Sequence, residues 1–560
     1  MPEYPWLKSY PKGVDWHAEL TPRPLHELME DAAIRYGDRT FIDFMGRKFS
    51  FRTIQRHVER AAVGLQKMGV TKGVHVGICM PNCPQYVISL FAVARAGGTV
   101  VNFSPLYSEH ELQHQARDAQ ISMMITVGLD LTYTKIRNIL DETDIRTLIV
   151  ADFAHALPFP QSLLFKIFRR RQMAPLRWDG RHRRFRDLLK AEGEWHKPEI
   201  DPLADVAMLQ YTGGTTGVPK GAMLTHANLS VNAEQSVAAF RDLEDGKEVI
   251  HGVLPFFHIF ALIAVGFVSV LKGATVVMQP RFRLEDVLKD LQTRRVTLLP
   301  AVPTMITAIN HALEEKPRSF PQLKLVVSGG ASLPVEVARK WVALTGVTIR
   351  EGYGLTEASP VVALTPADGG KEGSIGLPLP GTVVKIVDVD DASRDTPMGE
   401  PGELAVDGPQ VMKGYWNRPE ETAEVMHGNQ LLTGDIGIMD EDGYVFIVDR
   451  KKETIKVSGY NVFPRAIEEA IYEHPAVKEA AVIGVPDDYR GETPKCFVVL
   501  KPGAHLTDKE LLAFLKQRIG KHEMPEYVEF RDDLPKTPIG KILKKELVAE
   551  EEKKSEKADS

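Results

Sequence analysis

The sequence predicts an α/β protein with a large N-terminal domain of parallel-rich sheets flanked by helices and a small mobile α+β C-terminal domain. Strand-like apolar runs alternate with helical stretches over most of the chain, which is typical of parallel sheets covered by helices. A chain of 560 residues is also too long for one hydrophobic core. Because the pattern changes after residue 449, we expect domains at 1–449 and 450–545 and a charged, disordered tail at 546–560.

Strands and helices are expected to alternate from an early position in the N-terminal domain. A strand at 74–80, a helix at 85–96 and a strand at 99–103 follow one another, and two glycines break the helix before the second strand. The longest apolar run covers 13 residues, 259–271, which is too short to cross a bilayer and predicts a buried helix. Later strands are expected at 207–211, 249–254, 275–278, 297–300 and 323–328.

The C-terminal domain has another order of elements. A short helix at 464–473 precedes strands at 480–485 and 495–500, and a second helix follows at 508–519. This mixture predicts a compact α+β unit of ordinary domain size.

Composition excludes several classes of protein. The formal net charge is −6, from 69 basic and 75 acidic residues, and this balance gives no footprint for nucleic acid. Cys79, Cys83 and Cys496 are too few and too scattered for a disulfide framework or a four-ligand zinc site. The first residues lack the basic and apolar regions of a signal peptide. We therefore expect a cytoplasmic protein, either free or peripheral at the inner face of the membrane.

The segment 211–221, Tyr-Thr-Gly-Gly-Thr-Thr-Gly-Val-Pro-Lys-Gly, is the strongest functional signal. It follows an apolar strand-like run and offers threonine hydroxyls, backbone N–H groups and one lysine, which together can surround phosphate oxygens. It is not a Walker A loop, because Val218 and Pro219 stand where that loop needs glycine and lysine. A motor or GTPase therefore loses its main support, whereas nucleotide chemistry of another kind is favoured.

Further motifs follow this loop in a fixed order along the chain. They are Leu254–His258, Glu351–Glu357, Thr433–Asp435, Asp449–Val462 and Pro535–Lys541. With the loop, they resemble the acyl-adenylate-forming superfamily, which contains acyl-CoA synthetases, adenylation domains of peptide synthetases and beetle luciferases. The residues at 210–214 and 257–262 are most similar to bacterial long-chain fatty acyl-CoA synthetases. The resemblance implies an acyl-CoA synthetase-like fold and the use of ATP, Mg²⁺ and coenzyme A.

The resemblance also implies an ATP site. Thr356 would contact the α-phosphate, and Glu357 would hold Mg²⁺, since a hard divalent ion prefers a carboxylate beside phosphate oxygens. Asp435 and Arg450 resemble the pair that binds the ribose. The phosphates would be held by Thr212, Gly213, Gly214, Thr215, Thr216, Gly217 and Lys220, and the adenine by Gly330, Ala331, Glu351, Gly352, Tyr353 and Gly354. Without the resemblance, the two carboxylates would be ordinary loop and turn residues and the tyrosine a core aromatic.

Two reactions at one site are implied as well. Lys541 would bridge the carboxylate and the α-phosphate during adenylation, although a lysine in such a loop is normally a solvated charge. His258 would line the route of the acyl carboxylate and the thiol, although a lone histidine on an apolar segment is more often a core residue. The C-terminal domain would then rotate about Lys452, so that Lys456 enters the cleft and Gly459 lines the tunnel for CoA.

Residues 157–184 depart from the shortest pattern of the family. Phenylalanine and leucine stand beside clustered arginines there, and such a mixture suits contact with a membrane surface. The other interpretation is an amphipathic helix packed on its own domain, with its arginines in water. Both interpretations stay open from the sequence.

These observations favour an ATP-dependent fatty acid:CoA ligase that works through acyl-AMP, for medium to long chains, with the apolar stretch 256–271 as the wall of an acyl tunnel. The partners would be a fatty acid and CoA, with a homodimer as a further expectation. Other possibilities are a ligase for an aryl or other acid, an acyl-AMP ligase that loads a carrier protein, and a non-enzymatic lipid-binding or uptake protein.

Overall fold

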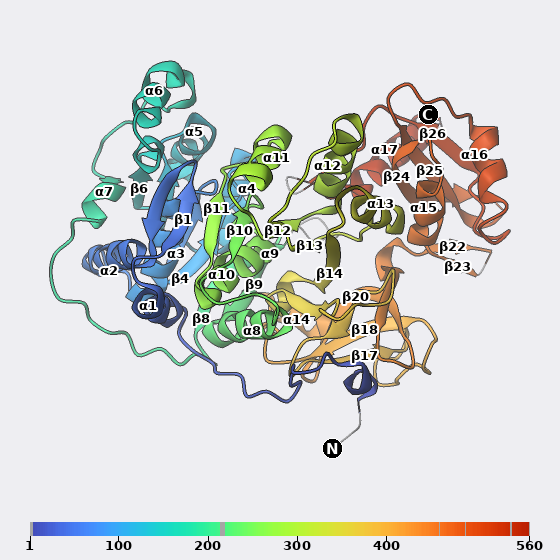
Figure 1. Ribbon diagram of the computed structural model, residues 1–560, viewed down its shortest axis with the longest axis horizontal. Helices are drawn as coiled ribbons and strands as arrows, with labels where there is room; N and C mark the ends of the chain where they lie inside the picture. The colour runs from blue at the N-terminus through green and yellow to red at the C-terminus, as the bar shows by residue number, and fades with distance from the viewer. Residues whose placement is uncertain (1–3, 213–218, 459, 488, 538–539, 559–560) are drawn as a thin grey trace.

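The computed structural model describes residues 4–212, 219–458, 460–487, 489–537 and 540–558. Figure 1 shows an N-terminal α/β part that fills most of the molecule, an antiparallel sheet below it, and a smaller C-terminal part at one end. The predicted α/β fold class is therefore confirmed. None of the described helices is both long and apolar enough to cross a membrane.

The first sheet has seven strands among the described residues, in the order β7-β6-β5-β3-β4-β8-β9. Its strands run parallel except for the last pair, β8 and β9, which are antiparallel and flank the glycine- and threonine-rich loop. The bounds are β3 His75–Cys79, β4 Thr99–Asn102, β5 Met123–Val127, β6 Thr147–Ala151, β7 His182–Arg184, β8 Val206–Thr212 and β9 Lys220–Thr225. The early alternation of strands and helices is confirmed, with α3 at Pro84–Ala96.

A second sheet contains nine strands of the described chain, in the order β16-β15-β14-β13-β12-β10-β11-β1-β2. Its centre is parallel and both of its edges are antiparallel. The bounds are β1 Thr40–Phe44, β2 Arg47–Ser50, β10 Val249–Gly252, β11 Thr275–Met278, β12 Leu298–Ala301, β13 Leu325–Ser328, β14 Thr348–Gly354, β15 Val361–Leu364 and β16 Leu377–Pro378. The four strands predicted between 249 and 328 all lie in this sheet.

Helices join the two sheets into one hydrophobic core. The apolar run 259–271 is helical and buried as expected, but its middle is a π-helical segment, η5 (Leu262–Phe267), between α9 (Ile259–Ala261) and α10 (Val268–Lys272). The other helices of this part are α1 Leu25–Tyr36, α2 Phe51–Lys67, α4 Glu109–Asp118, α5 Asp130–Ile139, α6 Gln161–Phe168, α7 Phe185–Leu188, α8 His226–Ala239, α11 Leu284–Thr293, α12 Pro303–Glu315, α13 Val335–Thr345 and α14 Pro419–Val425.

A third sheet, antiparallel, follows before the C-terminal domain, and none of its strands was predicted from the sequence. Its strands are β17 Val383–Val387, β18 Gly402–Asp407, β19 Met426–His427, β20 Gln430–Met439 and β21 Val445–Arg450. Bulges in two of the strand pairings weaken any simple alternation in the sequence. The sheet places Asp435 on β20 opposite Arg450 on β21.

The C-terminal domain has a sheet of five described strands with helices against it, as predicted. Its strands are β22 Ile455–Val457, β23 Tyr460–Val462, β24 Val477–Asp487, β25 Gly491–Leu500 and β26 Tyr527–Phe530. Its helices are α15 Pro464–Tyr472, α16 Asp508–Leu515 and α17 Lys544–Ala558. The second of these ends four residues before the predicted end at 519, whereas both predicted strands are longer than expected.

The expectation of a disordered tail at 546–560 is wrong for residues up to 558, because α17 covers them. Leu547 is fully buried and Val548 packs beside it against the C-terminal sheet. Glu551 pairs with Lys495 on β25 at 2.7 Å, and Glu550 pairs with Arg531 at 2.7 Å. Two adjacent apolar side chains and two ion pairs to the sheet therefore hold a segment that looked only charged in sequence.

Candidate active site

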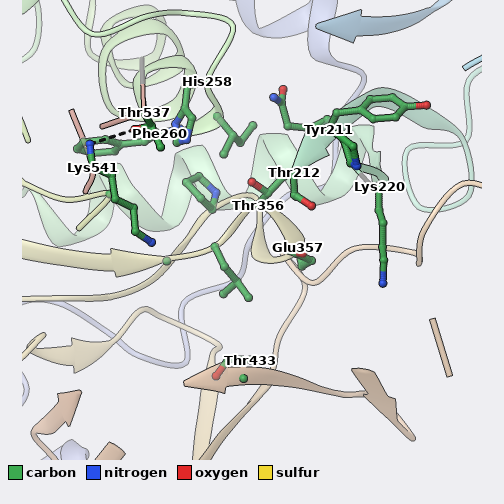
Figure 2. Close-up of a pocket in the computed structure, with 18 of the residues that line it drawn as sticks. Tyr211, Thr212, Lys220, His258, Phe260, Thr356, Glu357, Thr433, Thr537 and Lys541 are labelled. Atoms are coloured by element: carbon green, nitrogen blue, oxygen red, sulfur yellow. Dashed lines mark hydrogen bonds between the residues drawn. The ribbon is translucent and has the colours of Figure 1, made fainter. Parts of the chain in front are cut away.

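A cavity of about 940 Å³ lies between the N-terminal domain and the C-terminal domain, and many of the predicted site residues line it. Figure 2 shows Lys541 and His258 at one side of it and Lys220 at the other, with Thr356 and Glu357 between them. The predicted residues that line it are Thr212, Lys220, His258, Gly330, Gly352, Tyr353, Gly354, Thr356, Glu357, Arg450, Lys452 and Lys541. Gly213, Gly214, Thr215, Thr216, Gly217 and Gly459 lie outside the described residues.

The phosphate-loop segment enters the cavity from the edge of the first sheet. Thr212 ends β8 and Lys220 begins β9, and the two residues face each other in the antiparallel register. The Lys220 ammonium lies 5.2 Å from the centre of the Tyr415 ring, a cation–π contact that helps to position the side chain. Tyr211, just before the loop, donates a 2.5 Å hydrogen bond to Asp118, which also pairs with Arg418 at 2.7 Å. This contact fixes the base of the loop.

Thr356 and Glu357 lie on a short 3₁₀ helix, η6 (Thr356–Ala358), that follows β14 directly. The Tyr415 hydroxyl donates a 2.6 Å hydrogen bond to Oε1 of Glu357, and burial, followed by this carboxylate, raises the tyrosine's pKa. Oε2 of Glu357 accepts no hydrogen bond from the described residues. That oxygen, in a cavity with threonine hydroxyls, suits a hard cation such as Mg²⁺. No cluster of three acidic, histidine or cysteine side chains occurs among the described residues, so phosphate oxygens would have to complete the coordination.

The predicted ribose pair is assembled around one buried carboxylate. Oδ2 of Asp435 accepts a 2.6 Å hydrogen bond from the Tyr353 hydroxyl, and Oδ1 lies 3.0 Å from Nε of Arg450. Asp435, which holds Arg450 across the strand pair, is the main cause of that arginine's raised pKa. Tyr353 thus does more than offer an aromatic face, because its hydroxyl also orients the carboxylate. Each oxygen keeps a lone pair with which it can accept from a sugar hydroxyl.

The remaining residues of the predicted adenine pocket are close to this point. Gly330 has a left-handed φ of 80° in the turn after β13, so a side chain there would be strained. Glu351 does not line the cavity, since its Oε2 accepts the backbone N–H of Leu333 at 3.1 Å behind that turn. Burial raises the pKa of Glu351 to about 7. Ala331 also lies outside the lining residues.

Glu403 is a residue of this region that the sequence did not single out. It is 4 % exposed on β18, where Oε1 accepts from the backbone N–H of Gly434 at 3.0 Å and Oε2 from Nζ of Lys451 at 2.8 Å. It thereby joins the turn before Asp435 to the residue before Lys452. Glu403 and Tyr415 were both missed in the sequence because each acts through contacts with residues far away along the chain.

Lys541 reaches the cavity from the loop before α17. Its backbone N–H donates to Oγ1 of Thr537 at 3.0 Å. The preceding Gly540 has a φ of 83°, and a Cβ there would lie 2.4 Å from Oγ1 of Thr304 on α12. Glycine is therefore required for this loop to approach the N-terminal domain. Burial, followed by the nearby Arg450, lowers the pKa of Lys541 to about 8.

His258 lies at the start of α9, where its Nδ1 accepts the backbone N–H of Phe260 at 3.3 Å. Burial, with Lys541 as the next cause, lowers its pKa to about 4, so the ring is neutral at pH 7. Its segment is held by a buried amide chain, in which Asn102 donates to Gln210 at 2.9 Å and Gln210 donates to the carbonyl of Phe257 at 2.9 Å.

Lys452 and Lys456 differ in position. Lys452 lines the cavity on the 3₁₀ helix η7 (Lys451–Glu453), at the junction of the two domains. Lys456 lies on β22, is exposed, and donates to Oδ1 of Asn461 at 2.5 Å, outside the cavity. The structure therefore brings Lys541 to the predicted ATP site and leaves Lys456 away from it.

Comparisons with known proteins agree with this geometry. Residues 29–416 match the family model of the AMP-binding enzyme, and residues 466–541 match that of the AMP-binding enzyme C-terminal domain. A long-chain-fatty-acid–CoA ligase of Bacillus subtilis is 43% identical over 98% of this chain and 98% of its own. ATP-bound MatB of Rhodopseudomonas palustris has a TM-score of 0.81 at 29% identity, over 93% of this chain and 98% of that one.

Another solved structure with a similar fold holds a metal ion. The o-succinylbenzoate coenzyme A synthetase of Bacillus subtilis, in complex with ATP and magnesium, has a TM-score of 0.77 at 26% identity and covers 94% of this chain and 100% of its own. A family model that matches most of the chain and a relative that is similar along nearly its whole length show the family. The chain belongs to the AMP-binding enzymes.

Proposed function

We propose that this protein ligates a fatty acid of medium to long chain to coenzyme A, using ATP and releasing pyrophosphate and AMP, through an acyl-AMP intermediate. The observation that carries the proposal is the position of Lys541, which shares one cavity with the phosphate-side residues Thr212 and Lys220 and with His258 at the base of an apolar helix. The similarity to a long-chain-fatty-acid–CoA ligase supports the same activity.

The charges around the cavity fit the first reaction. A carboxylate must attack the α-phosphate of ATP, so two anions have to approach each other and charge builds up on the phosphorus. Lys220 and Lys541 supply positive charge from opposite sides. Glu357 would hold Mg²⁺, which would supply positive charge beside the phosphates, while Thr356 would donate to the α-phosphate. His258, neutral at pH 7, can line the carboxylate without adding a competing charge.

The wall behind Phe256 supports an aliphatic substrate. A small apolar gap of about 10 Å³ lies there, next to η5. Its lining includes Phe41, Tyr86, Val87, Leu90, Phe91, Phe256, Leu262, Gly266, Phe267 and Met278. The gap is smaller than a methylene chain requires, so an acyl tail would enter by displacing side chains. The π-helical turn beside it is a local irregularity of the kind that often marks functional sites.

A panel of acids from two to eighteen carbons tests this proposal. Each buried methylene contributes about 0.8 kcal/mol, which is roughly fourfold in kcat/KM, until the tail fills its site. We expect kcat/KM to rise steeply from short acids and then level off. A flat profile, or a preference for cinnamate-like or o-succinylbenzoate-like acids, would instead favour an aryl-acid ligase, an alternative kept open by the similarity to the o-succinylbenzoate synthetase.

Two other assays separate the remaining alternatives. Release of AMP that depends on added CoA would distinguish a CoA ligase from an enzyme that loads a carrier protein. Pyrophosphate exchange that depends on the acid would exclude a protein that only binds lipids. Removal of Mg²⁺ by a chelator should abolish both signals, because the phosphate charge would lose its counter-ion.

We also infer, as proposals of their own, a cytoplasmic location, a homodimer, and peripheral contact with a membrane through residues 157–184. Only the last of these has support from particular side chains. Long-chain acids concentrate in bilayers, so an enzyme that uses them gains access to substrate at that surface.

A further inference from the structure

Helix α6 protrudes from the N-terminal domain at the end of the molecule opposite the C-terminal domain (Figure 1). Large apolar side chains on it and just before it are exposed: Phe159 is 84 % exposed, Ile167 57 % and Phe168 76 %. Three arginines follow the helix directly, at 169–171. We propose that this surface, consisting of residues 159–171, docks on a membrane that contains anionic phospholipids.

Helix α6 is attached to the N-terminal domain, so the exposure of these side chains is not caused by a detached helix. Phe165 points inward, with its ring 5.5 Å from that of Phe153, and Lys166 pairs with Asp152 at 3.0 Å. These contacts hold one side of α6 on the domain. The opposite side presents Leu163 and Ile167, one helical turn apart, to solvent. The helix is therefore attached to its own domain through Phe165, as the other interpretation of this segment expects, but the face with Leu163 and Ile167 does not pack on the domain.

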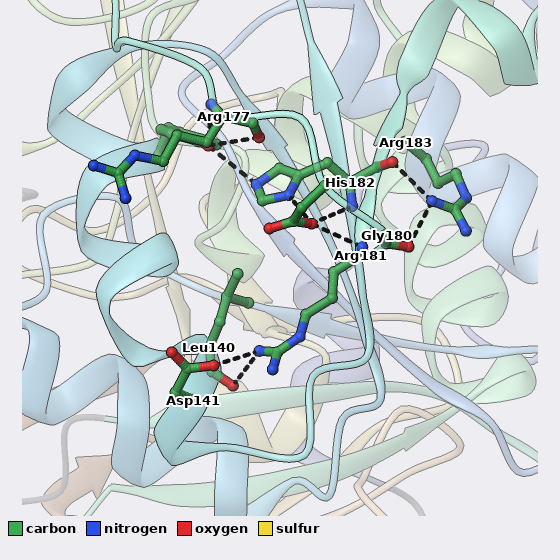
Figure 3. Close-up of polar contacts among 9 residues, drawn as sticks. Leu140, Asp141, Arg177, Gly180, Arg181, His182 and Arg183 are labelled. Atoms are coloured by element: carbon green, nitrogen blue, oxygen red, sulfur yellow. Dashed lines mark hydrogen bonds and ion pairs between the residues drawn. The ribbon is translucent and has the colours of Figure 1, made fainter.

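The arginines of the 157–184 segment fall into two groups. Those at 169–171 are exposed, and their side chains form no hydrogen bond or ion pair with any residue that the structure describes. Arg177 is also exposed and its side chain has no partner among the described residues, but it stands apart from this run, whereas Arg181 and Arg183 are held by the fold (Figure 3). Arg181 pairs with Asp141 at 2.8 Å, and Arg183 donates to the carbonyl of Gly180 at 2.8 Å.

Arg184 belongs to the second group too, because its guanidinium lies 4.7 Å from the centre of the Trp178 ring. The strand that carries these residues, β7, is fixed through His182, which bonds Asp179 at 2.7 Å and the Tyr133 hydroxyl at 3.0 Å. The proposed surface is thus narrower than the whole segment. It ends at 171, and Arg181, Arg183 and Arg184 are held at the edge of the first sheet.

The chemistry of the surface favours a lipid bilayer over a second copy of the chain. Phenylalanine, leucine and isoleucine enter the boundary between headgroups and acyl chains, while guanidinium groups pair with lipid phosphates. A twofold contact through the same patch would bring two sets of three unpaired arginines near each other, and the repulsion would oppose it. A bilayer with anionic headgroups offers the opposite charge and, beneath the headgroups, an apolar layer for the exposed side chains of the protruding helix.

Binding to vesicles tests the proposal with a matched pair of variants. The first replaces Arg169, Arg170 and Arg171 with glutamine, and the control makes the same three charge changes at Arg181, Arg183 and Arg184. Each surface arginine contributes up to roughly fivefold in affinity for anionic membranes. With vesicles of phosphatidylcholine and phosphatidylglycerol, we expect the first variant to bind at least about tenfold more weakly than the parent. The control should stay within about twofold of the parent, and added salt should weaken the parent's binding.

A second variant, Ile167→Ser with Phe168→Ser, tests the apolar part. This variant should bind vesicles about tenfold or more weakly than the parent, because burial of the two apolar side chains in the membrane is lost. Activity on a soluble short acid without vesicles should stay at the parent's level in all three variants, since none of these residues lines the cavity.

Equal vesicle binding by the parent and the first variant would overturn the proposal. It would also fail if both arginine variants lost binding equally, because diffuse positive charge would then explain the result. A change in the sedimentation coefficient of the lipid-free protein in the serine variant, from dimer to monomer, would assign the surface to self-association instead. The measurement does not depend on the substrate, so it stays informative if the proposed activity is wrong.

Discussion

Lys541 and Lys456 belong to the same small domain but lie in opposite environments. Lys541 is surrounded by protein in the cavity, and this burial, followed by the nearby Arg450, lowers its pKa to about 8. The Lys456 side chain is exposed, and within the described part of the chain it bonds only Asn461, a neighbour on its own hairpin. Of the two, only Lys541 thus lies in the cavity that we propose binds ATP. In the proposed two-step reaction, this arrangement of the domains would suit the first step, and the second step would need the small domain to turn.

Few polar contacts have to break for such a rotation. Arg465 on α15 donates to the carbonyl of Ile447 at 2.7 Å, and its backbone N–H donates to Asp449 at 2.8 Å. Glu469 accepts the backbone N–H of Val335 at 3.4 Å. Lys451, by contrast, is held by Glu403 on the N-terminal side of the joint. The residue before Lys452 is therefore held on the N-terminal side, whereas the contacts of Arg465 and Glu469 after it would have to break, so the hinge at Lys452 stays a prediction.

The largest effect is expected from a substitution of Lys541, on the rate of acyl-AMP formation. Lys541→Ala should slow formation of acyl-AMP by about 10²- to 10³-fold, the scale for losing one preorganised donor at developing charge. Thioester formation from supplied acyl-AMP and CoA should survive. Each half-reaction is measured separately on purified protein, with Lys545→Ala as a control for loss of a neighbouring lysine. Equal loss of both halves in a folded variant would contradict the assignment of Lys541 to adenylation.

The opposite result is expected at the joint. Lys452→Pro should slow thioester formation by about tenfold or more and leave acyl-AMP formation nearly intact, because a fixed φ hinders reorientation but tolerates the present arrangement. Lys456→Ala should affect the same half-reaction alone, since its side chain is outside the cavity here. If Lys452→Pro impaired only adenylation, the hinge would lie elsewhere and the rotation would lose its support.

The smallest effect is expected in the pH dependence of the adenylation half-reaction. Only protonated Lys541 can neutralise the α-phosphate, so kcat/KM for pyrophosphate exchange should fall as pH rises above about 8, where burial places its pKa. In Lys541→Arg the group stays charged, so that decline should move to much higher pH. Thioester formation from acyl-AMP should lack the Lys541 limb. A decline at the same pH in parent and variant would assign it to another group.

Most of the fold could be predicted because it depends on local patterns. Apolar runs such as 249–254 and 275–278 became β10 and β11 because a strand buried on both faces needs apolar residues throughout. The antiparallel sheet β17–β21 was not predicted, since its bulged strands carry a weak alternation. The tail was misjudged because Leu547 acquires its role only when β24 and β25 are beside it.

The type of reaction could be inferred from the sequence alone. The loop after β8, the Glu351–Glu357 motif and Lys541 are recognisable because such a reaction needs these residue types in this order. Which of the site residues lie in contact, by contrast, depends on the tertiary structure. It joined Tyr353, Asp435 and Arg450 around one carboxylate, added Tyr415 and Glu403, and separated Lys541 from Lys456. Hydrogen bonds and burial act over a few ångströms in space, whereas these residues are tens to hundreds of positions apart in the chain. Domain orientation, which no local pattern encodes, sets their distances.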